Sequence, residues 1–311
     1  MRIFFKKRLS IILVMLMVLS GMNGLFIGDD KAYANGVTFA GGTGSLELPY
    51  LIATPDQLNE VRNHLEAGIY FKLTADIDLS EYPADDDAGW LPIGYYVSST
   101  DYEFFSGNFD GNGFKIMNLM INRPAQDYIG LFETNKGTIA NVTLENINVT
   151  GNYAVGGLAG ENIGTINNTT VTGSVYGLGT SIGGLVAYNT SEISNSSSAA
   201  SVHGIETQVG GLAGANLTVD AERPATISNS FATGDVKGEG GYVGGLVGIS
   251  KGVSPAQNGY GSIKNSYATG NVSGGHRMGG LVGDNSHPIY NSYATGTVTG
   301  NVYGDDHEGH E

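Results

Sequence analysis

The chain of 311 residues contains 49 glycines and no cysteine, and its 15 Lys and Arg against 30 Asp and Glu give a formal net charge of −15 at pH 7. An acidic surface of this kind repels nucleic acid and anionic lipid, so neither is expected as a partner. It suits calcium, cationic partners or neutral glycans. Since no disulfide can form, stability must come from repetitive hydrogen bonding and burial.

Residues 1–34 have the pattern of a secretory signal peptide. Four cationic residues among the first eight precede an apolar run from Leu9 to Leu19, and small residues follow up to Ala34. The apolar run is shorter than the ~20 residues that a membrane-spanning helix needs. We therefore expect cleavage after Ala34 and no membrane insertion afterwards. The mature chain, with a net charge of −18, is expected to be secreted or displayed on the cell surface.

Residues 35–69 are expected to cap the N-terminal end of the fold with one short amphipathic helix. The segment from Thr54 to Gln57 places an N-cap threonine before a proline at the first helical position, with a glutamine at the capping-box position. Apolar residues then follow on one helical face, at Leu58, Val61 and Leu65. Gly68 is expected to end the helix.

Residues 70–130 are expected to form irregular first coils of a β-helix. Apolar and polar residues alternate from Phe71 to Leu79, which predicts a strand with one apolar face. Asp76 and Asp78 share the polar face at about 7 Å from each other, a separation that suits an inverting pair of catalytic carboxylates. A following acidic loop offers calcium ligands, at Asp85, Asp86 and Asp87. The alternative is an outward strand face and a solvated acidic loop.

Residues 131–300 are a tandem repeat in which six variants of Gly-Leu-Val-Gly are each followed by Ile-x-Asn. The leucines lie at steps of 27, 27, 27, 34 and 35 residues, at Leu131, Leu158, Leu185, Leu212, Leu246 and Leu281. The asparagines are Asn141, Asn168, Asn195, Asn229, Asn265 and Asn291. Each Ile stands 18 or 19 residues before the next Leu. The two longer steps therefore come from insertions between Leu and Ile, which we expect to form loops on one edge.

A unit of 27 residues cannot bury a core alone, so neighbouring copies must stack. Within each copy apolar and polar residues alternate with a period of two, which predicts strands rather than helices. We therefore expect an all-β fold, a parallel β-solenoid (β-helix) with two or three short strands per coil. The paired glycines fit a bend where successive coils approach with no room for a Cβ. The asparagines are expected to hydrogen-bond along a ladder with a spacing of about 4.8 Å.

The first repeat departs from the others at Ile147, which stands where later coils have a polar residue. A bulge or a register change is expected at this position.

An outward aromatic row is expected on the last three coils. The fourth position after each Ile faces outward by alternation, and there it is aromatic, at Phe231, Tyr267 and Tyr293. Exposed aromatic rings of this kind bind sugar rings or protein surfaces. The alternative is structural, because aromatic neighbours on adjacent strands stabilise a sheet by about 0.2 to 1 kcal/mol per pair.

These repeats resemble a known family. The Val-Gly-Gly-Leu-Val-Gly at 243–248, its copy at 279–283 and the Asn-Ser-Tyr-Ala-Thr-Gly segments are similar to the GLUG-motif repeats of secreted bacterial proteins. Trp90-Leu-Pro-Ile-Gly94 and Phe109-Asp-Gly-Asn-Gly113 resemble the segment that leads into such repeats. The resemblance covers roughly residues 39–300. It implies a β-helical surface module of the kind found in adhesin-like proteins, in IgA-specific metallopeptidases and beside carbohydrate-active domains.

Two short motifs resemble catalytic ones. In the acidic, His-containing tail at 301–311, His307-Glu-Gly-His310 is one residue shorter than the His-Glu-x-x-His of zinc peptidases and has no helical pattern. The segment Gly248 to Gly252 matches Gly-x-Ser-x-Gly, but it begins an insertion instead of joining a strand to a helix. Neither is expected to be catalytic.

The sequence therefore predicts a non-catalytic adhesion or binding module that recognises an extracellular glycan or a host or cell-surface protein through its outer faces. One alternative is a carbohydrate-active β-helix enzyme, a polysaccharide lyase or a glycoside hydrolase, that uses Asp76 and Asp78. Another is a non-catalytic part of a larger surface peptidase. No cofactor is expected apart from calcium at the acidic loop.

Overall fold

The computed structural model describes residues 37–82, 88–98, 101–254 and 260–300. All of these except Val37 belong to one compact unit that begins at Thr38. The predicted signal peptide, the calcium candidates Asp85, Asp86 and Asp87, and the tail at 301–311 lie outside the described residues.

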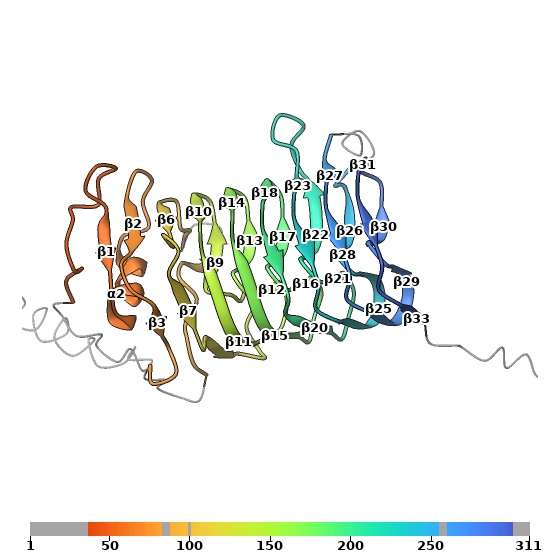
Figure 1. The fold of residues 1–311 in the computed structure, drawn as a ribbon, viewed down its shortest axis with the longest axis horizontal. Coiled ribbons are helices and arrows are strands. Elements are labelled where there is room, and N and C mark those ends of the chain that lie inside the picture. The colour runs from red at the N-terminus through yellow and green to blue at the C-terminus, as the bar shows by residue number, and fades with distance from the viewer. Residues whose placement is uncertain (1–36, 83–87, 99–100, 255–259, 301–311) are drawn as a thin grey trace, which may run out of the picture. The chain divides into compact units, whose positions relative to one another are not determined.

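The unit is a stack of chain turns in which strands of successive coils pair in parallel, as Figure 1 shows. Within the described residues these coils build three parallel sheets and one antiparallel hairpin. Each regular coil passes through the three sheets in turn, and its strands pair with those of the coils before and after it. The predicted parallel β-solenoid is confirmed.

Sheet A is the first of the three and has one strand per coil. Its nine strands are, in order of pairing, β1 (Tyr50–Ile52), β2 (Tyr70–Leu73), β6 (Asn108–Asp110), β10 (Thr138–Ala140), β14 (Thr165–Asn167), β18 (Glu192–Ser194), β23 (Thr226–Ser228), β27 (Ser262–Lys264) and β31 (Ile289–Tyr290). The Ile of each Ile-x-Asn phrase lies at the centre of the ladder, as in the pairing of Ile139 with Ile166 and of Ile166 with Ile193.

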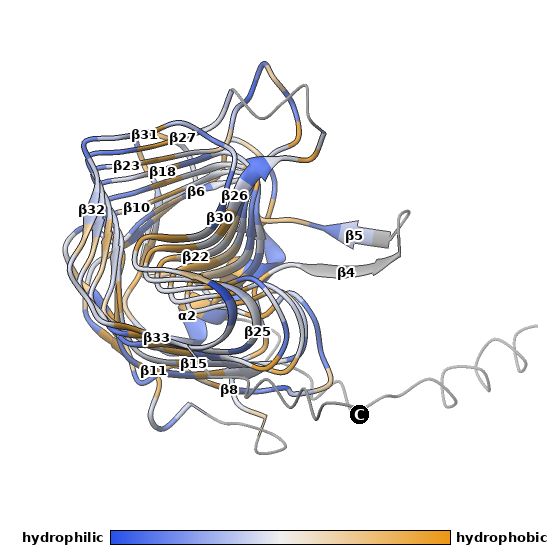
Figure 2. Ribbon diagram, turned by 90° about the vertical axis from the view of Figure 1, so that its right-hand side faces the viewer, coloured by the Kyte–Doolittle hydropathy of each residue, from blue (hydrophilic) through white to orange (hydrophobic). Residues whose placement is uncertain are grey.

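Sheet C contains the residues that follow each repeat leucine. Its six strands are β9 (Phe132–Asn135), β13 (Ala159–Asn162), β17 (Val186–Asn189), β22 (Ala213–Thr218), β26 (Val247–Gly252) and β30 (Val282–Asn285). The hairpin of β4 (Tyr95–Ser98) and β5 (Asp101–Glu103) projects beside this sheet in Figure 2.

Sheet B is the largest sheet and bends around one side of the solenoid. It contains β3 (Ile77–Asp78), β7 (Lys115–Met117), β8 (Met120–Asn122), β11 (Thr143–Gly151), β12 (Val155–Gly156), β15 (Thr170–Gly177), β16 (Ile182–Gly183), β19 (Ser197–Ser198), β20 (Ser201–Gly204), β21 (Val209–Gly210), β24 (Phe231–Ala232), β25 (Val236–Gly244), β28 (Tyr267–Ala268), β29 (Val272–Gly279), β32 (Tyr293–Ala294) and β33 (Val298–Gly300).

The core fills the interior of the coils, where Figure 2 shows the hydrophobic residues. The repeat leucines Leu131, Leu158, Leu185, Leu212 and Leu246 are fully buried. Leu281, in the last described coil, is only partly buried. Its partial exposure follows from its position, because no later coil among the described residues covers it.

The paired glycines of each repeat have two different roles. At the first, such as Gly210, a Cβ would collide with the carbonyl oxygen of Ala213, three residues on in the same turn. At the second, such as Gly211, it would collide with the carbonyl oxygen of Gly245 in the next coil. The predicted close approach of successive coils is therefore confirmed for both glycines, since a Cβ at Gly210 would also lie 2.7 Å from Gly248 N in the next coil, and the first glycine serves the bend as well.

The predicted asparagine ladder runs along the outside. Asn168 donates from Nδ2 to Oδ1 of Asn141 at 2.7 Å, and Asn265 donates to Asn229 at 3.1 Å. All six asparagines have positive φ, between 47° and 57°, a conformation that asparagine tolerates better than most residues. They both turn the chain and link the coils.

A second ladder, which the sequence reasoning missed, runs through the interior of sheet C. Asn135, Asn162, Asn189 and Asn216 are completely buried, and each of the first three donates from Nδ2 to Oδ1 of the next at 2.7–2.8 Å. Asn216 donates to the hydroxyl of Ser250 at 3.3 Å. These asparagines stand four residues after each repeat leucine, a spacing that alignment of the copies reveals.

The helix predicted near the N-terminus is present but shorter than expected. It comprises α2 (Pro55–Glu60) and the 3-10 turn η2 (Val61–Asn63), and Thr54 Oγ1 caps it by accepting from Gln57 N. It does not continue to Gly68, because the ring of His64 packs against Phe39 and the Leu65 carbonyl accepts from Ser106 N. Figures 1 and 2 place α2 at the N-terminal end of the coil interior.

The irregularity predicted at Ile147 is confirmed. The register between β11 and β15 shifts between Leu144 and Ile147, which is buried opposite Gly173.

The two insertions of the repeat both connect sheet C to sheet A, from β22 to β23 and from β26 to β27. Figure 2 shows the loop between β22 and β23 projecting from one corner of the coils.

Candidate functional site

The predicted aromatic row forms on sheet B. The rings of Phe231 and Tyr267 are parallel with centroids 4.8 Å apart, and those of Tyr267 and Tyr293 are 5.3 Å apart at 8°. Because the rings stack on one another, their faces are covered and mainly their edges point outward. Tyr293, at the end of the row, is 55% exposed. The geometry thus favours sheet stabilisation, and a binding role for the row stays a prediction.

The two candidate catalytic carboxylates both have structural partners. Asp76 accepts a hydrogen bond from Lys115 N at 2.8 Å. Asp78 accepts from Asn118 Nδ2 at 2.8 Å and from Ser80 N at 2.9 Å, and these bonds lower its pKa. Both side chains are exposed, but only Asp78 lies on a strand, because a bend at Ala75 splits the strand predicted from Phe71 to Leu79 into β2 in sheet A and β3 in sheet B. Both carboxylates connect the first coils to each other, which agrees with the structural alternative.

The Gly-x-Ser-x-Gly segment lies on strand β26 and not at a nucleophile elbow. Ser250 is completely buried, and its hydroxyl lies 3.1 Å from Nδ1 of His287. His287 is 2% exposed, its Nε2 has no hydrogen-bond partner among the described residues, and burial lowers its pKa to about 4. A serine and a histidine are in contact here, but a substrate cannot reach them. The pair continues the interior asparagine ladder.

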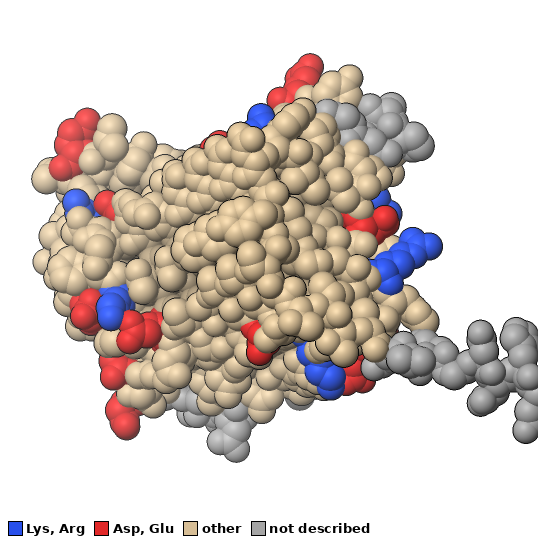
Figure 3. All heavy atoms as spheres, turned by 45° about the vertical axis from the view of Figure 1, so that its right-hand side comes forward, with Lys and Arg blue, Asp and Glu red and all other residues tan. Residues whose placement is uncertain are grey.

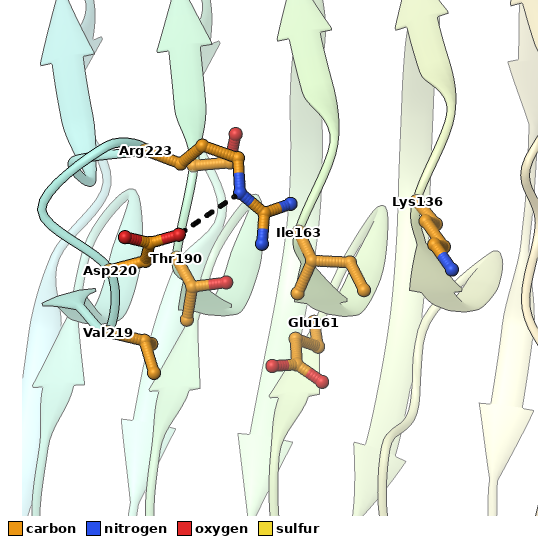
Figure 4. Close-up of a pocket in the computed structure, with 8 residues that line it drawn as sticks. Lys136, Glu161, Ile163, Thr190, Val219, Asp220 and Arg223 are labelled. Carbon is orange, nitrogen blue, oxygen red and sulfur yellow. Dashed lines mark ion pairs between the residues drawn. The ribbon is translucent and has the colours of Figure 1, made fainter.

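A groove over sheet C, which the sequence did not predict, is the fourth candidate. Two hollows of about 370 Å³ and 210 Å³ share Glu161 as a lining residue. Figure 4 shows the larger one, with Arg223 on the loop between β22 and β23 facing Glu161 on β13, and with Thr190 and Ile163 between them. Lys136 borders the same hollow. The loop is fastened by an ion pair of 3.6 Å between Arg223 Nε and Asp220.

Glu161 is a partly buried acidic residue that lines both hollows. It has no hydrogen bond and no ion pair with any described residue. Burial alone raises the pKa of its carboxyl. Its neighbours in the sheet are Thr134 on β9 and Tyr188 on β17. A partly buried carboxyl with a raised pKa in a hollow is typical of binding and catalytic sites.

Three tyrosines run beside Glu161 along the coils. The ring centroids of Tyr128 and Tyr153 are 5.7 Å apart, and those of Tyr153 and Tyr188 are 5.6 Å apart. The Tyr188 hydroxyl donates to the Tyr153 hydroxyl at 2.6 Å, and burial raises the pKa of Tyr188. Their rings meet at 73° and 44° instead of stacking in parallel, in contrast to the row on sheet B.

The surface and the described residues have three further features. The face turned forward in Figure 3 has few Lys, Arg, Asp or Glu side chains across its middle. Among the residues that the structure describes, no three His, Cys, Asp or Glu side chains are grouped as metal ligands. No described helix is long and apolar enough to cross a membrane.

The fold and the repeats define the class of protein. Residues 206–237 match the family model described as the GLUG motif. The resemblance predicted from the repeats is confirmed over this segment, which carries a GLUG motif within the parallel β-solenoid.

Its relatives include much longer proteins. The chain is 42% identical over 121 residues to a "Putative Gly-rich membrane protein" of Evansella cellulosilytica, a match that covers 39% of this chain and 13% of the relative. It is 40% identical over 125 residues to "Halomucin" of Haloquadratum walsbyi, covering 38% of this chain and 1% of that protein. The chain thus spans a small fraction of the length of these relatives.

A solved structure is similar over most of the chain. It is the crystal structure of a "putative immunoglobulin A1 protease" from Bacteroides ovatus, with a TM-score of 0.64 and 25% sequence identity. The match covers 85% of this chain and 86% of that one.

Proposed function

We propose that the chain is a non-catalytic, cell-surface binding module that recognises an extracellular glycan or protein through the outer faces of its solenoid. The GLUG motif and a relative named as a membrane protein support a place at the surface. The predicted signal peptide at 1–34 is the route by which the chain reaches it.

The observation that carries the proposal is the contrast between the two sides of each coil. The repeated leucines, glycines and asparagines are used in packing and in ladders between coils. The outward positions vary from coil to coil, and on three successive coils they present the rings of Phe231, Tyr267 and Tyr293. Tyrosine is enriched at protein interfaces because it combines an apolar ring with a hydroxyl.

The test is retention of the full chain on cell surfaces and on immobilised glycans. The triple variant Phe231→Ala, Tyr267→Ala, Tyr293→Ala should lose retention while its circular dichroism spectrum stays that of the wild type. Tyr176→Ala is the matched control, since Tyr176 is an outward ring on β15 that contacts His203 instead of the row. Retention of the triple variant at the wild-type level would rule out the row as the contact surface.

The enzymatic alternative predicts a different result for one variant. Asp76→Asn with Asp78→Asn should abolish polysaccharide cleavage if these carboxylates are catalytic. If the chain is a non-catalytic binding module, the wild type should cleave no polysaccharide. The double variant should then be retained on cell surfaces and glycans as well as the wild type is. The similar structure named as a protease favours the further alternative of a non-catalytic part of a surface peptidase. This sequence contains no His-Glu-x-x-His.

A further inference from the structure

The groove over sheet C has the chemistry of a ligand site. Its centre, Glu161, is a partly buried carboxyl that lines both hollows and has no hydrogen-bond or ion-pair partner in the described part of the chain. A carboxylate in this state is costly unless something donates hydrogen bonds to it. The missing donors point to a ligand.

We propose that this groove binds an uncharged oligosaccharide, with adjacent hydroxyls of one sugar residue donating two hydrogen bonds to Glu161. A carboxylate has two oxygens and accepts several hydrogen bonds, so a pair of neighbouring hydroxyls matches it. The Thr190 hydroxyl and the terminal nitrogens of Arg223 lie around the same hollow and supply further partners. The site goes beyond the proposed function, since it does not need the aromatic row.

The walls of the groove match the apolar face of a sugar. Ile163 and Val219 line the larger hollow, and Phe104 and Tyr128 line the smaller one. The volume of about 370 Å³ lies within the 300–1,000 Å³ typical of small-molecule sites. Since the two hollows meet at Glu161, the ligand crosses several coils, which suits a chain of sugars better than a single one.

The charges around the groove argue for a ligand without net charge. Glu161 at the centre repels an anion, and Arg223 and Lys136 at the border repel a cation. The side chain of Arg223 is 74% exposed, and its pairing with Asp220 weakens its field further. A neutral ligand that both donates and accepts hydrogen bonds can pair with all of these groups without electrostatic repulsion.

A peptide fits the groove less well. Peptides commonly bind by adding a strand to an open sheet edge. The floor of the groove is formed by β13 and β17, which are paired on both sides, with β9 and β22. Their backbone groups are already used, so the ligand must be held by side chains.

The experiment measures binding of the full chain to neutral cello-, xylo-, manno- and chito-oligosaccharides, with galacturonan and chitosan oligosaccharides as charged comparisons. We expect binding to at least one neutral series and a loss of affinity of about tenfold or more in Glu161→Gln. Glu192→Gln on β18 is the matched control, because Glu192 is an exposed carboxylate on sheet A.

Arg223→Ala should also weaken binding. Because Arg223 is an exposed loop residue, its replacement should leave the fold intact, so weaker binding of this variant reports on the site itself. The inference is overturned if only the charged oligosaccharides bind, if none binds, or if Glu161→Gln binds as tightly as the wild type. The triple variant of the aromatic row distinguishes failure of the groove hypothesis from failure of the proposed binding role of the row. It should bind the neutral oligosaccharide normally even if its retention on cells is lost.

Discussion

Replacing Asn189 by alanine tests whether the interior ladder holds the coils together. Asn189 is completely buried, accepts from Asn162 Nδ2 at 2.8 Å and donates to Asn216 Oδ1 at 2.7 Å. In the variant Asn216 Oδ1 loses its donor. Asn162 Nδ2 keeps only its bond of 3.2 Å to the Glu192 carbonyl, so one of its two hydrogens has no acceptor.

The expected loss of stability follows from these two buried polar groups. Each unsatisfied group costs about 1 to 3 kcal/mol, so Asn189→Ala should lower the free energy of unfolding by about 2 to 6 kcal/mol. This is a large part of the ~5 to 15 kcal/mol by which a domain is stable. Because neighbouring repeats stabilise each other, the loss should spread to adjacent coils.

Urea unfolding followed by circular dichroism at 218 nm, about the minimum of a β-sheet spectrum, measures the effect. Asn168→Gly is the matched control, since Asn168 belongs to the exposed outer ladder and glycine tolerates its φ of 49°. Water replaces its lost bond, so the control should stay within about 1 kcal/mol of the wild type. If Asn189→Ala were no more destabilising than Asn168→Gly, the reasoning about the interior ladder would be refuted.

Two other predictions concern the same scaffold. The native state keeps His287 unprotonated down to about pH 4, whereas the unfolded chain takes up the proton near pH 6.5. The free energy of unfolding should therefore fall as the pH drops from 6.5 to 4, by at most about 3 kcal/mol. Urea midpoints at pH 7 and 4.5 check this, and His287→Asn should flatten the difference. Gly210→Ala should prevent folding or lower the free energy of unfolding by several kcal/mol, because the added Cβ would collide with backbone atoms. Gly241→Ala should have a small effect, because the atom nearest to its Cβ is 3.6 Å away. Thermal unfolding of the two variants measures the difference.

The repeat period predicts most of the fold, because the same residues recur at the same place in every coil. Leu158 and Leu185 are 27 residues apart and lie in successive coils, and Ile166 pairs with Ile193 as the alignment implies. The longer steps after Leu212 and Leu246 likewise place both insertions at one corner. Residues at equivalent positions of successive repeats are therefore neighbours in the structure.

The interior ladder was missed for a physical reason. Asparagine is usually taken as a turn residue or a surface residue, and the outer asparagines such as Asn141 fit this expectation. Asn162 and Asn189 are buried because each one satisfies the next, which only the stacked coils make possible. Their constant spacing from the leucines was the available signal.

The groove could not be predicted from the repeats because it is made of positions where the repeats differ. Glu161, Thr134 and Tyr188 occupy equivalent positions in three coils and share no chemistry. Arg223 comes from an insertion. Only the fold shows that these side chains meet, and that Glu161 is left without a partner among the described residues.

The most direct test of the claim that this solenoid binds a neutral oligosaccharide in the groove over sheet C is a crystal structure of the chain with the neutral oligosaccharide that it binds best. The account predicts sugar density in the groove over sheet C, with two hydroxyl oxygens within hydrogen-bond distance of Glu161 and a sugar face against Tyr128. Density elsewhere on the solenoid, with Glu161 still without a partner, would contradict it.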